Sequence, residues 1–148
     1  MKKMEKNTNK GFSLVELIIV IAIMVVLVAL LAPQFLKFVE KSKKSTDMQN
    51  VDSIVTAVEV YAIDPDKETD LAGTGTVTLS KDGVAAEGDG YTDALTAAGI
   101  DGNKTALKST KWGADSIVLT FKYTNATGKV EVKANIPAIL TDGKVSTK

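Results

Sequence analysis

A long apolar run near the amino terminus is the strongest pattern in the sequence. No charged residue occurs from Leu17 through Leu36. At ~1.5 Å per helical residue, a run of this length matches the ~30 Å hydrocarbon core of a bilayer. Lysines flank the run on both sides, so the positive charges alone do not decide its orientation. The pattern predicts a membrane-spanning helix over residues 12–36.

Beyond Gln34 the pattern becomes amphipathic, with apolar side chains at spacings of three and four. This periodicity predicts a helix with one stripe buried in a core. The stripe consists of Met48, Val51, Ile54, Val55, Val58, Tyr61 and Ala62, and the residues expected on other faces are Lys44, Asp47, Asn50, Asp52 and Glu59. If the helix continues unbroken from about residue 14 to Ala62, it is roughly 73 Å long. The sequence Asp64-Pro65-Asp66 ends it.

Alternating apolar and polar positions in the last third of the chain predict an antiparallel hairpin. The inward positions are Ile117, Leu119, Phe121 and Tyr123 on one strand and Val130, Val132, Ala134 and Ile136 on the next, with the turn at Asn125–Gly128. Weaker signals predict a strand at Thr76–Leu79, a short helix at Asp93–Ala98, a loop at Gly99–Asn103 and an edge strand at Lys144–Ser146 after an Asp142-Gly143 turn.

Composition narrows the function classes. The sequence has no His and no Cys, which removes the commonest general base, the thiolate nucleophile and the usual zinc ligands. Its 18 basic residues balance 18 acidic ones, so no overall positive field favours nucleic acid. We therefore expect that the protein is not an enzyme and that it has no catalytic residue, cofactor or metal site.

Glu16 lies at the start of the apolar run and decides between interpretations of that run. A cleavable secretory signal would have a shorter apolar region, and a domain this small could not surround the whole run as a buried helix. A plain single-span anchor explains everything here except Glu16. An ionised carboxylate at membrane depth costs on the order of 2.5–3.5 kcal/mol, so Glu16 is expected to have a partner or a function.

The residues around Glu16 resemble a known motif. The sequence Lys10-Gly11-Phe12-Ser13-Leu14-Val15-Glu16, followed by an aliphatic run, is similar to the prepilin cleavage and methylation motif of type IV pilins and their relatives. The resemblance implies that a prepilin peptidase cuts between Gly11 and Phe12 on the cytoplasmic side and then N-methylates Phe12. It also implies an amino terminus inside the cell and a bend or melted stretch at Pro33.

Cleavage would create a positive amine at Phe12, and Glu16 of a subunit already in place could then pair with that amine on an incoming subunit. In low dielectric such a pair favours both charges only in the correct register, because every other register leaves a charge unpaired. Phe12, Glu16 and Pro33 are therefore the expected assembly residues.

The expected organisation has four parts: a leader at 1–11, a transmembrane or filament-core helix at 12–36, an amphipathic continuation at 37–63 and a globular head at 64–148. The fold class is α+β, with the long amino-terminal helix packed on a small antiparallel sheet as in the pilins.

The resemblance implies the structural subunit of a type IV pilus, a surface filament for adhesion, motility or biofilm formation. The alternatives are a pseudopilin of a type II secretion or DNA-uptake system and, in another class, a membrane-tethered extracellular binding domain. The implied partners are further copies of the chain, the prepilin peptidase, and the pilus assembly platform with its ATPase. The implied location is the cytoplasmic membrane before assembly and the cell surface afterwards.

Other candidate sites in the head are weaker. Asp64, Asp66, Glu68 and Asp70 alternate as calcium ligands do, but Thr69 and Gly75 replace the Gly and the acid of an EF-hand loop, so a solvated loop is favoured. Asn125-Ala126-Thr127 fits a glycosylation acceptor and equally a turn. Trp112 is expected at the core or its rim. The lysines Lys104, Lys108 and Lys111 are expected to be solvated, and nucleic-acid binding by repetition along a fibre stays open.

Overall fold

The structure is a computed structural model that describes residues 11–67, 71, 73–124, 129–137, 139–141 and 144–145. The chain divides into two compact units. We call Met1–Val39 the amino-terminal unit and Glu40–Lys148 the globular unit. The ten residues before Gly11, which hold most of the expected leader, lie outside the described part of the chain.

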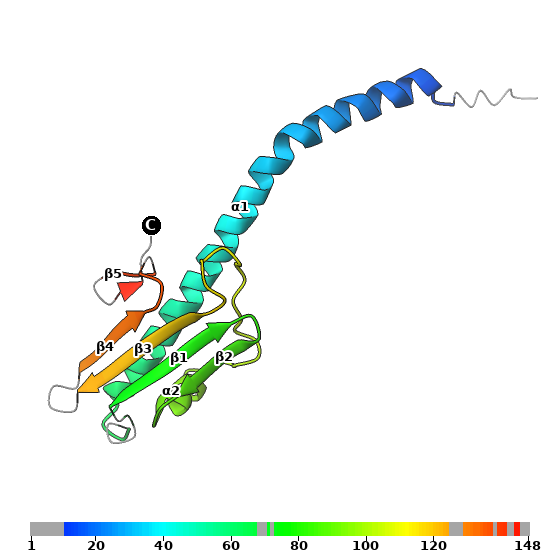
Figure 1. Ribbon diagram of the computed structural model, residues 1–148. Helices are drawn as coiled ribbons and strands as arrows, with labels where there is room; N and C mark the ends of the chain where they lie inside the picture. The colour runs from blue at the N-terminus through cyan, green and yellow to red at the C-terminus, as the bar shows by residue number, and fades with distance from the viewer. Residues whose placement is uncertain are drawn as a thin grey trace, which may run out of the picture. The chain divides into compact units, whose positions relative to one another are not determined.

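Helix α1 spans Leu14–Ala62 and confirms the single long helix expected from the sequence (Figure 1). It runs through Pro33 without interruption, so the structure contains no melted stretch at that position. Every residue from Gly11 to Phe38 is exposed. The helix is long and apolar enough to cross a membrane, and an uncharged surface of this length needs an apolar environment or partner.

The buried stripe of α1 is also confirmed. Val51, Ile54, Val55, Val58, Tyr61 and Ala62 are all buried, and Met48 packs against the same cluster. Asp47 was expected on another face, and this prediction was wrong because its side chain is fully buried. A carboxylate is stable there only if hydrogen bonds replace its hydration, and the loop that follows helix α2 supplies them.

Four antiparallel strands form the main sheet, in the order β2-β1-β3-β4. Their bounds are β1 Thr74–Ser80, β2 Gly83–Glu87, β3 Ile117–Thr124 and β4 Lys129–Ala134. Val77 of β1 lies opposite Ala86 on one side and Leu119 on the other. The weak strand predicted at Thr76–Leu79 is thus a central strand of the sheet.

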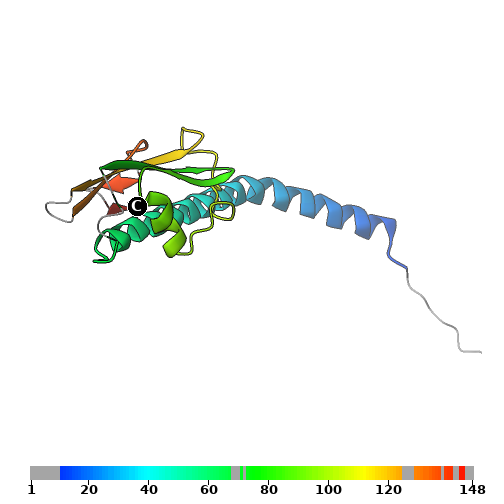
Figure 2. The same ribbon diagram turned by 90° about the horizontal axis from the view of Figure 1, so that it is seen from below.

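One face of the sheet is buried by helices. Ile117, Leu119, Phe121 and Tyr123 of β3 point into the core, while the alternate residues face outward, as the sequence pattern predicted. Figure 2 shows the second half of α1 and helix α2, Tyr91–Ala97, on the same side of the sheet. Helix α2 confirms the short helix expected at Asp93–Ala98, although it begins two residues earlier.

The end of the chain differs from the expectation. Strands β5 (Leu140–Thr141) and β6 (Lys144–Val145) pair with each other in a separate two-stranded sheet. They do not extend the main sheet as an edge strand, because their partners are each other's residues and not those of β2 or β4. The predicted turns at 125–128 and 142–143 lie outside the described residues, and Ile136 lies beyond the end of β4.

Candidate processing and assembly site

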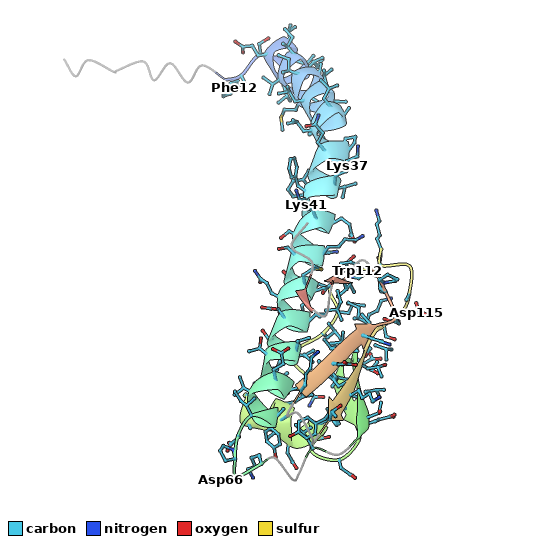
Figure 3. All side chains as sticks on the ribbon, turned by 90° about the vertical axis from the view of Figure 1, so that its left-hand side faces the viewer. Phe12, Lys37, Lys41, Asp66, Trp112 and Asp115 are labelled. Atoms are coloured by element: carbon cyan, nitrogen blue, oxygen red, sulfur yellow. The ribbon has the colours of Figure 1, made fainter. Side chains whose placement is uncertain are left out.

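The chain around Gly11 and Phe12 is non-helical and open to solvent. Gly11, Phe12 and Ser13 precede the first turn of α1, and 93% of the Phe12 surface is exposed. Figure 3 shows Phe12 just before the first turn of α1. Residues 11–13 are thus a non-helical, solvent-exposed segment next to the first turn of α1.

Ser13 and Glu16 together cap the start of α1. The backbone N–H of Ser13 donates to Glu16 Oε2 at 2.9 Å, and the backbone N–H of Val15 donates to Ser13 Oγ at 3.3 Å. The first helical bond joins the Leu17 N–H to the Ser13 carbonyl at 3.2 Å. A Ser followed three residues later by a Glu is the sequence signature of a capping box. Both residues were expected to belong to the cleavage motif, and their capping role was not predicted.

Glu16 is the only charged residue in the first half of the described amino-terminal unit. Its carboxylate lies within one turn of Phe12, so a new amine at Phe12 would be created near this charge. Charged residues return at Lys37 and Lys41, as Figure 3 shows along α1. Within residues 11–36, the start of the apolar helix thus carries one acidic side chain, Glu16, and no basic side chain.

Pro33 is not brought together with Phe12 and Glu16. It lies on the exposed surface of α1, seventeen positions beyond Glu16, which corresponds to about 25 Å along the helix. Pro33 and Glu16 therefore lie at different levels of the helix.

A second polar arrangement lies inside the globular unit. Asp47 accepts hydrogen bonds from the backbone N–H of Lys108 at 2.6 Å, the backbone N–H of Ser109 at 2.8 Å and the indole N–H of Trp112 at 2.9 Å. The Ser109 hydroxyl also donates to the carboxylate of Glu40. These contacts tie the loop between α2 and β3 to α1, so Asp47 has a structural role.

Trp112 occupies the rim of the core, as expected. Its ring packs against the core cluster, and the ammonium of Lys44 lies 4.7 Å from the ring centre. A cation at this distance over an indole ring contributes a modest attraction. Lys104, Lys108 and Lys111 are exposed, in agreement with the expectation of solvated charges.

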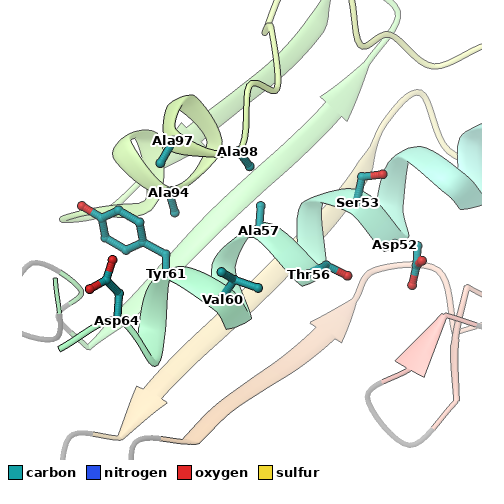
Figure 4. A pocket seen from close by; sticks show the side chains of 10 residues that line it. All are labelled: Asp52, Ser53, Thr56, Ala57, Val60, Tyr61, Asp64, Ala94, Ala97 and Ala98. Carbon is teal, nitrogen blue, oxygen red and sulfur yellow. The ribbon is translucent and has the colours of Figure 1, made fainter. Parts of the chain in front are cut away.

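A shallow groove of about 420 Å³ lies between α1 and α2 (Figure 4). Its floor consists of small residues, Ala57, Ala94, Ala97 and Ala98, and two acids, Asp52 and Asp64, stand at its edges. The Ser53 hydroxyl in its wall donates to the carbonyl of Gln49 on the same helix at 2.9 Å. The groove is therefore lined largely by small side chains, and the Ser53 hydroxyl in its wall is bonded within its own helix.

The acidic loop after α1 is only partly described. Asp64 and Asp66 are exposed, and the backbone N–H of Asp66 donates to Asp64 Oδ1 at 3.0 Å, which makes a local turn. Glu68 and Asp70 lie outside the described residues, as does the Asn125-Ala126-Thr127 acceptor. Within the described ranges no three acidic side chains gather at a distance suited to one metal ion.

The chain is similar to a family model and to a curated protein. The family model described as the prokaryotic N-terminal methylation motif matches residues 6–32. A curated relative, the type IV major pilin protein PilA of Myxococcus xanthus strain DK1622, is 39% identical over 64 residues. That alignment covers 43% of this chain and 29% of the relative, so the chain matches less than a third of the relative's length. No solved structure matches the chain.

The motif match includes Gly11, Phe12, Ser13 and Glu16, the residues that the structure places at and just before the start of α1. The fold supplies the long exposed helix and the antiparallel sheet expected to follow such a motif. Together with the pilin relative, these findings show that the chain is similar to type IV pilins in its amino-terminal motif and in its α+β fold.

Proposed function

We propose that the chain is the structural subunit of a type IV pilus and polymerises through its amino-terminal helix into a surface filament. The observation that carries this proposal is the exposed, uncharged surface of α1 from Leu17 to Leu36, which begins one residue after a single carboxylate. Such a surface is stable in a bilayer before assembly and in a bundle of like helices afterwards. The subunit thus passes from the cytoplasmic membrane to the cell surface.

Processing prepares the helix for this transfer. A prepilin peptidase cuts between Gly11 and Phe12 and methylates the new amine, which keeps its positive charge. The exposed, non-helical backbone at Gly11 and Phe12 supports this assignment. An incoming subunit then presents its Phe12 amine to Glu16 of the subunit already in place, and Pro33 acts farther along the rod.

The globular unit covers the filament and carries its outer surface. The matched relative is named a major pilin, and adhesion, motility and biofilm formation are functions typical of this family. We assign the chain a mechanical role without catalysis, with an assembly platform and its ATPase as partners. A pseudopilin would share the amino-terminal motif, so the surface filament itself distinguishes the two.

Replacement of Glu16 tests the proposal. The Glu16→Ala variant is expected to remain in the membrane while the wild-type chain appears in the fraction sheared from the cell surface. Glu59→Ala, which removes an exposed acid from the same helix, is the matched control and is expected to assemble normally. If Glu16→Ala is sheared off in wild-type amounts, Glu16 has no role in assembly and that part of the proposal fails. If the wild-type chain never leaves the membrane, the chain is a membrane-tethered domain and the whole proposal fails.

A further inference from the structure

Among the described residues, one of the two carboxylate oxygens of Glu16 takes part in the cap. Oε2 accepts the backbone N–H of Ser13 at 2.9 Å, while the side chain as a whole is exposed. A carboxylate has about four acceptor sites, so a bond to Oε2 leaves capacity for a second donor. Glu16 therefore has the chemistry to hold its own helix end and to receive an external amine at the same time.

How much the cap stabilises the helix depends on whether the helix start lies in water or in an apolar environment. A helix start leaves four backbone N–H groups without intrahelical partners, and the bonds made by Ser13 and Glu16 satisfy two of them. In water the unpaired groups bind solvent, so the cap adds little stability. In the apolar interior of a helix bundle or bilayer no solvent replaces the cap, so each unsatisfied group is far more costly.

We propose that Glu16 has two separable roles in the filament, an intrachain cap that it makes with Ser13 and the intersubunit charge pair. Ser13 is a positioning residue that acts through this cap: it fixes the helix start at Leu14 and satisfies backbone groups that would otherwise enter the filament core unpaired. The proposal rests on the polymerisation proposed above. It assigns to Ser13 a role that cleavage of the Gly11–Phe12 bond does not require.

Glutamine separates the two roles, because Gln caps a helix start as Glu does but carries no charge. Glu16→Gln keeps the cap and loses the charge pair, whereas Glu16→Ala loses both. Ser13→Ala removes the acceptor for the Val15 N–H and keeps the charge pair, and Ser13→Thr retains a capping hydroxyl. These four single variants are the test set.

The first measurement is amide hydrogen exchange at Ser13 in the full isotope-labelled chain in detergent micelles, followed by NMR. Glu16→Ala is expected to accelerate this exchange on the order of tenfold, the loss of one typical capping interaction. Glu16→Gln is expected to leave it within about threefold of wild type. If Glu16→Ala leaves the exchange unchanged, the cap does not exist in an apolar environment and the proposal is overturned, whether or not the chain polymerises.

The second measurement is the amount of each variant in sheared filaments relative to its processed membrane pool. Ser13→Ala is expected to assemble less than wild type although its cleavage is complete, and Ser13→Thr is expected to restore assembly. Glu16→Gln is expected to retain more assembly than Glu16→Ala. If Ser13→Ala assembles like wild type and the two Glu16 variants fail equally, Glu16 acts as a counter-ion alone. A wild-type chain absent from the sheared fraction instead refutes polymerisation, and the exchange measurement still decides the cap.

Discussion

The indole N–H of Trp112 donates a hydrogen bond to Oδ2 of Asp47 at 2.9 Å, across a separation of 65 residues in the sequence. Asp47 also accepts the backbone N–H groups of Lys108 and Ser109, so three donors from one loop converge on one buried carboxylate. Hydrogen bonds to a charged acceptor are about twice as strong as neutral ones. The loop between α2 and β3 is therefore fixed to α1 mainly through Asp47, next to the bond from the Ser109 hydroxyl to Glu40.

Replacement of Asp47 by Ala is expected to destabilise the globular unit by about 3 kcal/mol, because it leaves three donors without their acceptor. Asp47→Asn is expected to cost less, since its one remaining carbonyl oxygen still accepts. Urea unfolding of the full chain in detergent, followed by the fluorescence of Trp112, measures both values, and Trp112 is the sole tryptophan.

Asp52→Ala is the matched control for this prediction. Asp52 lies on the same helix and is exposed, so its loss is expected to change the free energy of unfolding by less than about 0.5 kcal/mol. Equal effects of the two alanine substitutions would show that the hydrogen bonds to Asp47 do not stabilise the fold.

The burial of Asp47 was not predictable from the sequence pattern. The periodic apolar residues of α1 identified the buried stripe, because helix geometry is local and regular. A buried Asp breaks that pattern, and its partners lie more than sixty positions away on a loop. No local signal connects them, so the burial of Asp47 required the three-dimensional structure.

Gly83 is expected to be intolerant of substitution. Its φ of +134° is one that side-chain-bearing residues rarely adopt, and a Cβ there would collide with the carbonyl oxygen of Gly102. That carbonyl also accepts the N–H of Val84 at 2.7 Å, so it is not free to move. Gly83→Ala is expected to cost at least about 2 kcal/mol in urea unfolding.

Gly99→Ala provides the contrast. Gly99 has a φ of +71° but open space around its Cβ position, so only backbone strain of about 1 kcal/mol is expected. Similar costs at Gly83 and Gly99 would mean that the contact with Gly102 contributes nothing.

Tyr123 offers a stabilising substitution. Its hydroxyl is buried, and within the described part of the chain no hydrogen-bond partner reaches it. Tyr123→Phe removes this unsatisfied group and is expected to raise the free energy of unfolding by about 1 kcal/mol. Tyr91→Phe, whose hydroxyl donates to the Gly73 carbonyl at 3.4 Å, is expected to give no such gain. Destabilisation by Tyr123→Phe would reveal a partner for the hydroxyl.

Tyr91 is expected to make stability depend on alkaline pH. Burial raises the pKa of Tyr91 above its ordinary value of 10.0, so the folded chain resists ionisation of this phenol. The unfolded chain releases the proton first, and stability present below about pH 10 is lost as the pH rises through the folded-state pKa. Urea unfolding from about pH 8 to about pH 11 is expected to show this fall. Tyr91→Phe is expected to flatten it, and an equal fall in that variant would assign the effect to other groups.

The strands of the main sheet also differ in how well the local sequence pattern predicts them. Strands β3 and β4 were predictable because their apolar and polar residues alternate over several positions. Strand β2 was missed although Ser80 pairs with Gly83 around a two-residue turn at Lys81 and Asp82. The turn residues Lys81 and Asp82 are not the Asn-Gly or Asp-Gly pair typical of such turns, and Val84, Ala85 and Ala86 lack the alternation that marks a strand.

The candidate site was recognised from contiguous residues, because processing and capping both depend on a short local segment. Gly11, Phe12 and Glu16 were named from the motif, and the Ser13 to Glu16 spacing would also have predicted the cap. The proposed pairing of Glu16 with a neighbouring subunit involves a second chain, so it rests on the motif and not on the fold of one subunit.

The intact mass and amino-terminal sequence of the protein sheared from the cell surface test the central claim most directly. The account predicts a chain that starts at Phe12 and carries one added methyl group, which would establish processing and surface assembly together. A chain that is absent from the sheared fraction and stays in the membrane with its amino terminus at Met1 would contradict the account.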